Sequence, residues 1–584
     1  MAVVIDVQEA LTRVSGLDPL QLNDLLVDAP EPTVGNLSGL RSSPANVLYL
    51  FEKLPTADWN DPFGKLMEAR AFRFISKLSR RKPDESDRNW PFKLPPKDYQ
   101  LGVFAPARFM PFFALAPVAT GTGKTKMLID IAADKYMRGE IDGAMVVAAP
   151  GGVPRQWIDE ALPEHMTDAV KWVGALWKST RNTDKRIMSP YTRNRMRWLA
   201  FKVEAFSRDN SKAEKDARAF LSSGRMMLIW DESSRGKNPN AQRTKAFIGT
   251  WSRGKHTPGL GALAVSRAIS SGTPITKGLE DLWSQFEFLD PKVIGMSNYY
   301  AFRARYCVTV PAFRGAGLGA VRIAGYRNTE EFVRKIAPVT FVVPKEVLGL
   351  DKPVYSELPV EATREQKMAY NALRHQLVED LQEMKIASPV NAAVRFVRLQ
   401  QVLCGRVYEQ PSDLEEPPFA KAIASNRIAT LMEYVEDNPG PNVIWARFTQ
   451  DILDIEAALR KAGRNPVTYY GDVSDDERAI RKAQFIRGDA TDFVANAATA
   501  GMGLDGLQKV CWRGIFYSNS FSRENRWQAV DRLYRMQQTA AAQIVDLVVP
   551  RSIDRTILDS YKKTEELVAS IMSRPELITT LNDE

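Results

Sequence analysis

The sequence predicts an α/β protein whose core consists of two tandem lobes, each built on a parallel sheet. Short apolar runs alternate with longer amphipathic segments from Tyr99 to about Pro291, and the same rhythm returns at Val443. This alternation is typical of β-α units, in which helices cover the faces of a parallel sheet. The chain has 584 residues, which leaves room for several domains, since one domain usually takes about 100 to 200 residues.

The first lobe, residues 91–291, is expected to contain buried strands at 144–149 and 226–230. The second lobe, residues 426–584, is expected to contain strands at 443–445, 467–469, 492–495, 514–517 and 543–548. Between them, residues 292–425 show helical periodicity at 363–385 and 389–403, which predicts a helical interlobe region. Residues 1–90 show mixed helical periodicity interrupted by prolines, which predicts a small, mainly helical N-terminal module and a linker.

Bulk composition narrows the class of protein. The net charge of +9 favours a polyanionic partner such as DNA, although an ordinary basic enzyme fits the charge equally well. No apolar run approaches the length of a membrane span, and the N-terminus lacks the pattern of a signal peptide. Cys307, Cys404 and Cys511 have no paired spacing, so we expect no structural zinc and a cytoplasmic location.

A glycine-rich segment before the helical stretch 126–137 predicts a phosphate-binding loop. Its members are Thr120, Gly121, Thr122, Gly123, Lys124 and Thr125. Backbone N–H groups at a helix N-terminus attract phosphate, Lys124 can reach the β and γ phosphates, and the Thr125 hydroxyl can bind Mg²⁺. Val118 stands where the usual pattern has its first glycine, so a simple glycine-rich entry to a helix remains an alternative.

Two carboxylates directly follow the strand predicted at 226–230. Because Asp231 and Glu232 would then lie at the carboxyl end of a parallel strand beside the phosphate loop, Asp231 can hold Mg²⁺ and Glu232 can orient or deprotonate the attacking water. Upstream of the loop, the Gln100 amide can read the edge of adenine, although an isolated glutamine is more often a surface residue. ATP and Mg²⁺ are therefore the expected cofactors.

Seven stretches, taken in order, resemble the Swi/Snf branch of superfamily-two DNA helicases. In the first lobe these are residues 145–150 with Trp157, the Asp-Glu-Ser-Ser-Arg-Gly-Lys-Asn run at 231–238, Ser-Gly-Thr-Pro-Ile at 271–275, and residues 282–291. In the second lobe they are residues 442–448, residues 499–505 and the run Gln-Ala-Val-Asp-Arg-Leu-Tyr-Arg-Met-Gln-Gln at 528–538. The resemblance extends over roughly residues 94–570, and its order and spacing make chance agreement negligible.

The resemblance implies two RecA-like lobes that share one ATP site and move along DNA, with duplex favoured over single strands. It assigns Arg532 and Arg535 to the γ phosphate as arginine fingers, which neutralise charge in the transition state. It also places Gly503 where the backbone approaches a ligand closely, with a simple turn as the alternative. The compact chain looks like a bacteriophage or bacterial member, acting in replication, recombination or repair with proteins of those processes as partners.

The expected links to nucleic acid rest on weaker signals. Ser271 and Thr273 resemble the hydroxyls that couple the ATP cleft to DNA, although they can equally cap a turn before Pro274. A basic run at 178–202 contains Arg193, Arg195 and Arg197, which we expect to contact the phosphate backbone, with a solvated helix face as the alternative.

The sequence departs from the family pattern in three places. Ser234 replaces the histidine of the Asp-Glu-Ala-His box, Pro117 and Val118 replace the residues usual just before the phosphate loop, and Asp505 stands where asparagine is common. None removes a group that performs chemistry, but together they leave the coupling between hydrolysis and movement open.

Two other functions fit the same sequence. One is a binding module whose ATP site only switches conformation to recruit or displace a partner protein. The other is the motor subunit of a restriction or defence complex, in which a separate subunit would cleave DNA. The residues that would support turnover, Lys124, Asp231, Glu232 and Arg535, favour an enzyme over the switch.

Overall fold

The computed structural model describes residues 75–572 apart from short internal stretches, together with four short strands nearer the N-terminus. The internal residues left out are 150–152, 180–184, 189–193, 210, 253–254, 297, 312–320, 383–388, 410–418, 499–503 and 505. The four strands are β1 (Val4–Val7), β2 (Leu11–Ser15), β3 (Gly39–Arg41) and β4 (Asp58–Trp59), in the order β3-β2-β1-β4. The sequence pattern does not predict a sheet there. Most of residues 1–74 lie outside the described part, so the mainly helical module stays a prediction.

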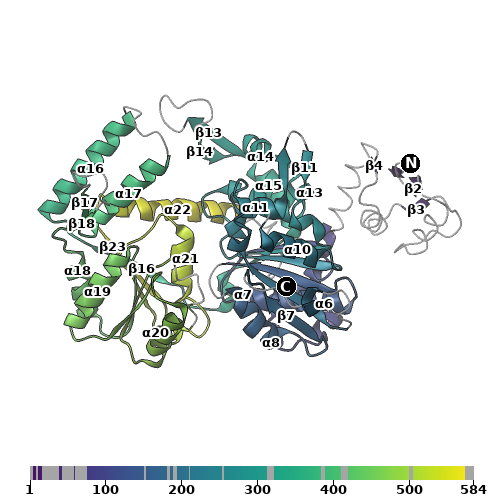
Figure 1. Ribbon diagram of the computed structural model, residues 1–584, viewed down its shortest axis with the longest axis horizontal. Helices are drawn as coiled ribbons and strands as arrows, with labels where there is room; N and C mark the ends of the chain where they lie inside the picture. The colour runs from purple at the N-terminus through teal and green to yellow at the C-terminus, as the bar shows by residue number, and fades with distance from the viewer. Residues whose placement is uncertain are drawn as a thin grey trace.

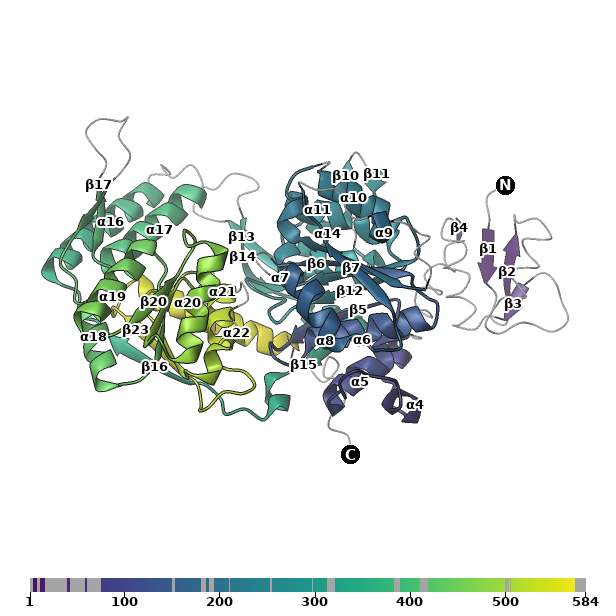
Figure 2. The ribbon, with the colours of Figure 1, turned by 60° about the horizontal axis from the view of Figure 1, so that its bottom comes forward.

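The first lobe contains a seven-stranded sheet in the order β15-β5-β12-β9-β6-β8-β7. The strands are β5 (Phe112–Val118), β6 (Gly143–Ala148), β7 (Trp172–Leu176), β8 (Met196–Lys202), β9 (Met226–Asp231), β12 (Ser266–Ser270) and β15 (Thr340–Val343). Every neighbouring pair is parallel. All residues of β6 and β9 are buried, because helices cover both faces of a parallel sheet. In Figure 2, α6 and α8 lie on one side of this sheet and α10 and α11 on the other.

The second lobe contains a six-stranded parallel sheet in the order β16-β23-β22-β19-β21-β20. Its strands are β16 (Val354–Pro359), β19 (Asn442–Trp445), β20 (Pro466–Tyr469), β21 (Asp492–Ala495), β22 (Arg513–Phe516) and β23 (Gln543–Val548). Successive residues of a strand point to opposite faces. Accordingly, Ile444 packs in one hydrophobic cluster of this lobe and its neighbours Val443 and Trp445 pack in the other. The two tandem RecA-like sheets expected from the sequence are confirmed (Figure 1).

Helices and short hairpins complete the lobes. Those of the first are α4 (Glu85–Arg88), α5 (Asp98–Ala107), α6 (Lys124–Met137), α7 (Val153–Gln156), the π-helical turn η1 (Trp157–Ala161), α8 (Leu162–His165), α9 (Lys185–Met188), η2 (Val203–Phe206), α10 (Lys212–Leu221), η3 (Ser233–Gly236), α11 (Gln242–Ile248), β10 (Thr250–Ser252), β11 (Lys255–Thr257), η4 (Leu260–Leu263), η5 (Leu279–Leu282), α12 (Trp283–Leu289), α13 (Pro291–Ile294), α14 (Tyr299–Tyr306), β13 (Cys307–Pro311), β14 (Val321–Tyr326), α15 (Thr329–Ile336), η6 (Ala337–Val339) and η7 (Lys345–Leu348). Those that follow β16 are α16 (Arg364–Gln382), α17 (Pro389–Leu403), β17 (Arg406–Glu409), β18 (Phe419–Ala422), α18 (Arg427–Asp437), α19 (Thr449–Lys461), α20 (Asp475–Arg487), η8 (Leu507–Lys509), α21 (Arg523–Asp531) and α22 (Ile553–Met572).

The chain crosses between the lobes directly after β15. This strand lies at the edge of the first sheet, and the next strand, β16, lies at the edge of the second. Both fall within residues 292–425, the stretch expected to form a helical interlobe region. The long helices α16 and α17 do follow there and lie at the outer end of the second lobe (Figure 1). The exact domain division at 291 and 425 stays a proposal.

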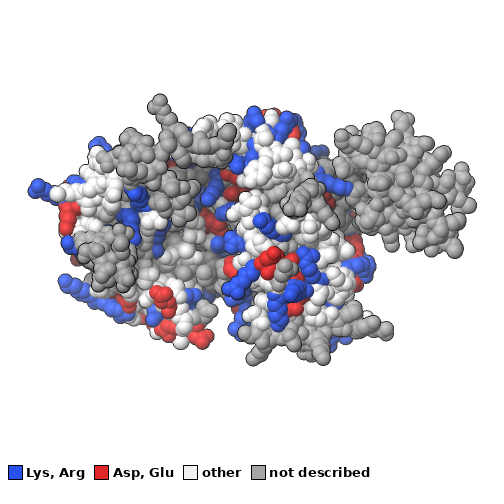
Figure 3. Space-filling view, turned by 45° about the horizontal axis from the view of Figure 1, so that its top comes forward, with Lys and Arg blue, Asp and Glu red and all other residues white. Residues whose placement is uncertain are grey.

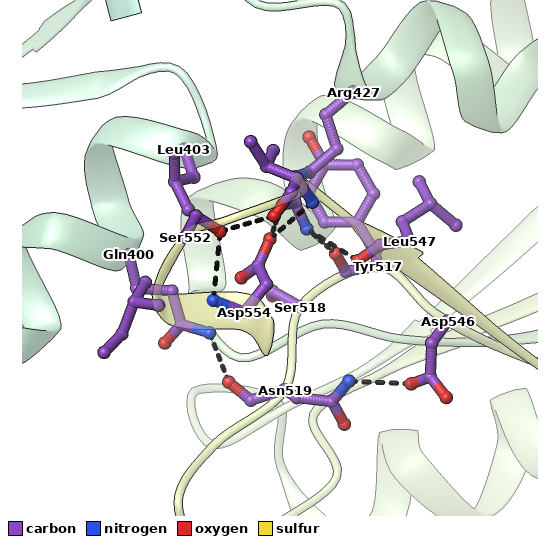
Figure 4. A network of polar contacts seen from close by, with 12 residues as sticks. Gln400, Leu403, Arg427, Tyr517, Ser518, Asn519, Asp546, Leu547, Ser552 and Asp554 are labelled. Carbon is purple, nitrogen blue, oxygen red and sulfur yellow. Dashed lines mark hydrogen bonds and ion pairs between the residues drawn. The ribbon is translucent and has the colours of Figure 1, made fainter. Parts of the chain in front are cut away.

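A buried polar network joins α17 to the core of the second lobe (Figure 4). Arg427, at the start of α18, is fully buried and donates to the carbonyl oxygens of Tyr517 and Leu547 while pairing with Asp554 of α22. On α17, Gln400 donates to the Asn519 carbonyl oxygen, and the Asn519 amide donates to Asp546 at 2.7 Å. Because buried polar groups need partners, this network fixes how α17, α18 and α22 sit on the sheet.

No helix of the described residues is long and apolar enough to span a membrane.

Candidate active site

The phosphate loop connects β5 to α6 in the first lobe. Gly121 and Gly123 have φ angles of 87° and 85°, in the left-handed region that glycine adopts without strain. Lys124 is the first residue of α6. The N-terminal N–H groups of this helix therefore face the cleft as the sequence predicted. Lys124 Nζ donates to the Val118 carbonyl oxygen at 3.2 Å, so the lysine folds back over its own loop.

The side of this loop is held by α5. Gln100 Nε2 and the Tyr99 hydroxyl both donate to the Thr122 carbonyl oxygen, at 2.8 and 3.1 Å. Gln100 Oε1 accepts from the Lys97 backbone N–H. A Cβ at position 123 would stand 2.4 Å from Gln100 Nε2, so only glycine fits against the amide. In this structure the Gln100 amide positions the loop; any contact with adenine would use its remaining N–H and lone pair.

The two carboxylates lie where β9 ends. Asp231 accepts three hydrogen bonds, from Trp157 Nε1 at 3.0 Å, from Ser270 Oγ at 2.5 Å and from the Glu232 backbone N–H at 3.1 Å. These donors hold the carboxylate in one orientation at the wall of the cleft. Ser234, which stands in place of the box histidine, is fully buried, and its hydroxyl is among the described side chains that have no hydrogen-bond partner.

Glu232 has positive φ, 51°, an uncommon conformation for a residue other than glycine. Its carboxylate lies 3.6 Å from Lys124 Nζ and accepts a long hydrogen bond of 3.4 Å from Ser271 Oγ. Burial raises the pKa of Glu232 above its ordinary value, and the Asp231 carboxylate adds to this effect, whereas Lys124 opposes it. A half-buried carboxylate with a raised pKa is suited to accept a proton from water near neutral pH.

The second lobe closes the site with the end of α21 and the residues that follow it. Arg532 and Arg535 line the same cleft of about 530 Å³ as the first-lobe residues. A Cβ at Gly121 would lie 3.7 Å from Arg535 Cβ, so the tip of the phosphate loop directly faces this segment. The lining also includes Thr120, Gly123, Lys124, Thr125, Trp157, Asp231, Glu232, Arg235, Gln528, Asp531 and Met536.

The orientation of α21 is fixed within its own lobe. Arg526 forms two hydrogen bonds to the Asp546 carboxylate, at 2.6 and 2.7 Å. Two-pronged arginine–carboxylate pairs of this kind specify geometry as well as adding energy. The helix thus carries Arg532 and Arg535 to the cleft as one rigid unit with β23.

The sequence of the chain is similar to those of several known proteins. Protein p41 of Acyrthosiphon pisum secondary endosymbiont phage 1 is 23% identical over 361 residues, which cover 59% of this chain and 72% of p41. An ATP-dependent helicase of Mycoplasma genitalium is 21% identical over 350 residues, 58% of this chain and 30% of the helicase. The ISWI chromatin-remodeling complex ATPase CHR17 of Arabidopsis thaliana is 22% identical over 465 residues, 76% of this chain and 39% of CHR17. The chain is a distant relative of SWI2/SNF2-type ATPases.

No family model matches the chain. Among solved structures, the Sulfolobus solfataricus SWI2/SNF2 ATPase core in complex with dsDNA is 19% identical and aligns over 84% of this chain and 95% of that one, with a TM-score of 0.35. The chain spans about a third of the length of its helicase and remodeling relatives.

The structure brings together most of the residues predicted for the ATP site. Gln100 contacts the phosphate loop at the Thr122 carbonyl oxygen, and the Ser271 hydroxyl donates to Glu232, which lines the cleft. Both Ser271 and Thr273 are buried. Gly503 and Arg193 lie outside the described residues.

The prediction for Arg197 is wrong. Arg197 lies on β8 with only 3% of its surface exposed, and its guanidinium donates to Ser223 Oγ and to the Ser223 carbonyl oxygen. A buried arginine satisfied by such partners cannot meet a phosphate backbone. Arg195, two residues earlier, is exposed, and its DNA contact stays a prediction.

Several contacts of the site were not predicted. Trp157 was singled out by the resemblance but without a role, and its bond to Asp231 joins residues 74 positions apart. Ser270, which directly precedes the predicted Ser271, also donates to Asp231, and no local pattern marks it. Lys345 pairs with Asp531 across 186 residues, and no local pattern signals such a contact.

Proposed function

We propose that this protein is an ATP hydrolase that uses the energy to move along duplex DNA. One observation carries the proposal. Lys124, Asp231 and Glu232 of the first lobe face Arg532 and Arg535 of the second across a single cleft. A site divided between two lobes can be completed when they close and opened when they separate, and this links turnover to movement.

The residues present fit a nucleotide with Mg²⁺. Lys124 and the N–H groups of the glycine loop would bind the phosphates. Thr125 and Asp231 offer the hard oxygen ligands that Mg²⁺ prefers, and both line the cleft. When bound, Mg²⁺ would neutralise charge on the phosphate oxygens. The hydrogen bonds from Trp157 and Ser270 hold the Asp231 carboxylate in one orientation, as partners of a metal ligand do.

Glu232 would take a proton from the attacking water, which the site orients. Arg532 and Arg535 would stabilise the charge that develops on the γ phosphoryl group. A switch that only binds ATP needs neither the base nor the arginines, so their presence in one cleft favours turnover over the switch.

The proposal of DNA as the track rests on charge and on the relatives. The chain carries a net charge of +9. Basic side chains interleaved with acidic ones gather where the two lobes meet on the face shown in Figure 3. Two of the relatives are an ATP-dependent helicase and a chromatin-remodeling complex ATPase. A role in replication, recombination or repair, or inside a defence complex, is compatible with such a motor.

The test is ATP hydrolysis with Mg²⁺ in the presence of no nucleic acid, single-stranded DNA, duplex DNA or RNA. We expect duplex DNA to stimulate hydrolysis most and the protein to displace a triplex-forming strand from duplex DNA. Lys124→Ala should abolish turnover, and Arg535→Ala should abolish it with ATP binding retained, because arginine fingers contribute roughly 10³ to 10⁵ in rate. Arg487→Ala, an exposed arginine of the same lobe paired with Asp489, is the matched control.

Three results would reject parts of the proposal. Unchanged hydrolysis in Lys124→Ala would place the ATP site elsewhere. Normal turnover in Arg535→Ala would remove the second lobe from catalysis. Hydrolysis that no nucleic acid stimulates would remove DNA as the track.

A further inference from the structure

The segment that links the two sheets is bound to both halves of the cleft. It leaves β15 at Val343, forms the short turn η7 and enters β16 at Val354. On the first-lobe side, the Val343 carbonyl oxygen accepts from the Ala119 backbone N–H at 3.0 Å, at the base of the phosphate loop. Leu348 approaches the tip of the loop, where a Cβ at Gly121 would lie 4.0 Å from its Cδ1.

On the second-lobe side, the same segment grips the end of α21. Lys345 forms an ion pair and hydrogen bond with Asp531, the residue directly before Arg532. The Lys345 ammonium also lies 4.2 Å from the centroid of the ring of Tyr534, the residue that directly precedes Arg535 in the sequence. Further along, Gln538 Nε2 donates to the Asp351 carbonyl oxygen at 3.4 Å, and Leu350 packs against a hydrophobic cluster of the second lobe.

The Lys345–Asp531 pair is shielded from water. The two side chains are 9% and 5% exposed, which is low for a lysine and an aspartate. Burial lowers the pKa of Lys345 and Asp531 opposes this, while Arg535 and Lys124 stand close enough to lower it further. Because Lys345 lies near the other cations Arg535 and Lys124, its buried ammonium relies on the Asp531 carboxylate for charge neutralisation.

We propose that Lys345 is a positioning residue of the ATP site, which sets the distance of Arg532 and Arg535 from the phosphate loop. The inference rests on the proposed ATP hydrolysis and extends it to a residue outside the cleft lining. Among the described residues, Lys345 lies in the segment that crosses from the first sheet to the second, and it holds the arginine segment through Asp531. Lobe 2 would therefore approach the nucleotide along a path that the crossing segment determines.

A second set of contacts, within the second lobe, holds α21 in place independently of Lys345. α21 is anchored in its own lobe by the pair of Arg526 with Asp546 of β23, a contact separate from the Lys345–Asp531 pair. Loss of Lys345 should therefore leave the second lobe folded but release the end of α21 from the phosphate loop. Because a displacement of about 1 Å can cost about 100-fold in rate, the arginines would then act poorly.

The test compares Lys345→Met, which keeps the length and removes the charge, with Lys345→Arg, Asp531→Asn and the double variant Lys345→Met/Asp531→Asn. We expect kcat for ATP to fall about 10- to 100-fold in Lys345→Met, with the nucleotide Kd changed less than about threefold. Lys345→Arg should recover part of the rate. The double variant should be no slower than either single one, since partners of one interaction are not additive. Arg464→Met, which breaks a buried ion pair with Asp492 inside the second lobe, should leave kcat unchanged.

A distance measurement tests the same idea without hydrolysis. The three native cysteines are buried, so fluorophores can be placed on Met137→Cys in α6 and Ile480→Cys in α20, which are exposed in opposite lobes. Lys345→Met and Asp531→Asn should change energy transfer between them in the same way, and Arg464→Met should not.

The outcomes separate the two proposals. If the unmodified protein hydrolyses ATP but Lys345→Met keeps its kcat, or raises only KM, Lys345 has no positioning role. The same conclusion holds if Arg464→Met slows turnover equally, because the effect is then general loss of stability. If the unmodified protein does not hydrolyse ATP, the proposed function fails. If neither Lys345→Met nor Asp531→Asn changes the energy transfer, the inference about Lys345 is overturned.

Discussion

Replacing Trp157 by phenylalanine removes one hydrogen bond from the proposed metal ligand with little change in packing. The indole starts the π-helical turn η1, is 2% exposed and stacks against Trp198 with ring centroids 6.3 Å apart. Its N–H donates to Asp231 Oδ2 at 3.0 Å. A hydrogen bond to a charged group contributes about 1.5 to 3 kcal/mol, which corresponds to roughly 10- to 150-fold in an equilibrium or rate constant.

We expect the loss to appear in the dependence of hydrolysis on Mg²⁺. Without the indole N–H, Oδ2 of Asp231 loses its buried donor, so the carboxylate is freer to rotate away from the orientation that binds the metal. The Mg²⁺ concentration for half-maximal hydrolysis should therefore rise, within the range given above. The assay is the hydrolysis rate as a function of Mg²⁺ at saturating ATP, with thermal unfolding measured alongside.

The first lobe contains a matched control. Trp177 Nε1 donates to Asp216 Oδ2 at 2.8 Å, the same type of bond away from the cleft. Both of these side chains are half-buried, so Trp177→Phe should destabilise the lobe less than Trp157→Phe and should not change the response to Mg²⁺. If Trp157→Phe and Trp177→Phe give the same Mg²⁺ curve, Trp157 does not tune the metal site and the reasoning is wrong.

Two further predictions concern buried carboxylates. Glu524, at the start of α21, lies 3.2 Å from Arg235 and 3.5 Å from Lys237 of the first lobe. Because a partly exposed ion pair contributes about 1 kcal/mol or less, Glu524→Gln should raise KM for ATP about two- to fivefold. Steady-state kinetics that show an unchanged KM would contradict this prediction. Burial raises the pKa of Glu287 to about 8 from 4.5, and Asp290 adds to the effect. The protonated Glu287 carboxyl therefore contributes its full stabilisation to the folded protein below pH 4.5, and this contribution is lost as the pH rises through about 8. Between pH 5 and 8.5 the protein should lose up to about 5 kcal/mol relative to Glu287→Gln in denaturant unfolding, and parallel curves for the two proteins would exclude this.

The sheets were predictable where the strands are buried on both faces. The run at 226–230 became β9, and that at 144–149 became β6 one residue earlier, because continuous apolar runs are what a covered parallel sheet requires. β16 gives no such signal. It is an edge strand whose residues are mostly exposed, so its hydrophobic pattern does not distinguish it from the connection in which it lies.

The chemistry of the site was predictable from local motifs, whereas its supporting contacts were not. A glycine loop before a helix and two carboxylates after a strand are short patterns with a direct physical meaning. The partners of those groups come from distant segments, as Trp157 and Lys345 show. Arg197 illustrates the opposite error: a run of basic residues gives the charge of a segment but not the direction in which each side chain points.

The contacts of α21 indicate in which order the site should open. The helix is tied to the first lobe at its start by Glu524 and at its end by Asp531, and to its own lobe in between by Arg526. The contact at the start involves first-lobe side chains that are 29% exposed, whereas the pair at the end is almost fully buried. Water and salt weaken the exposed contact more. Separation of the lobes should therefore begin at Glu524 and end at Lys345, so that Arg532 and Arg535 remain beside the phosphate loop until the last contact breaks.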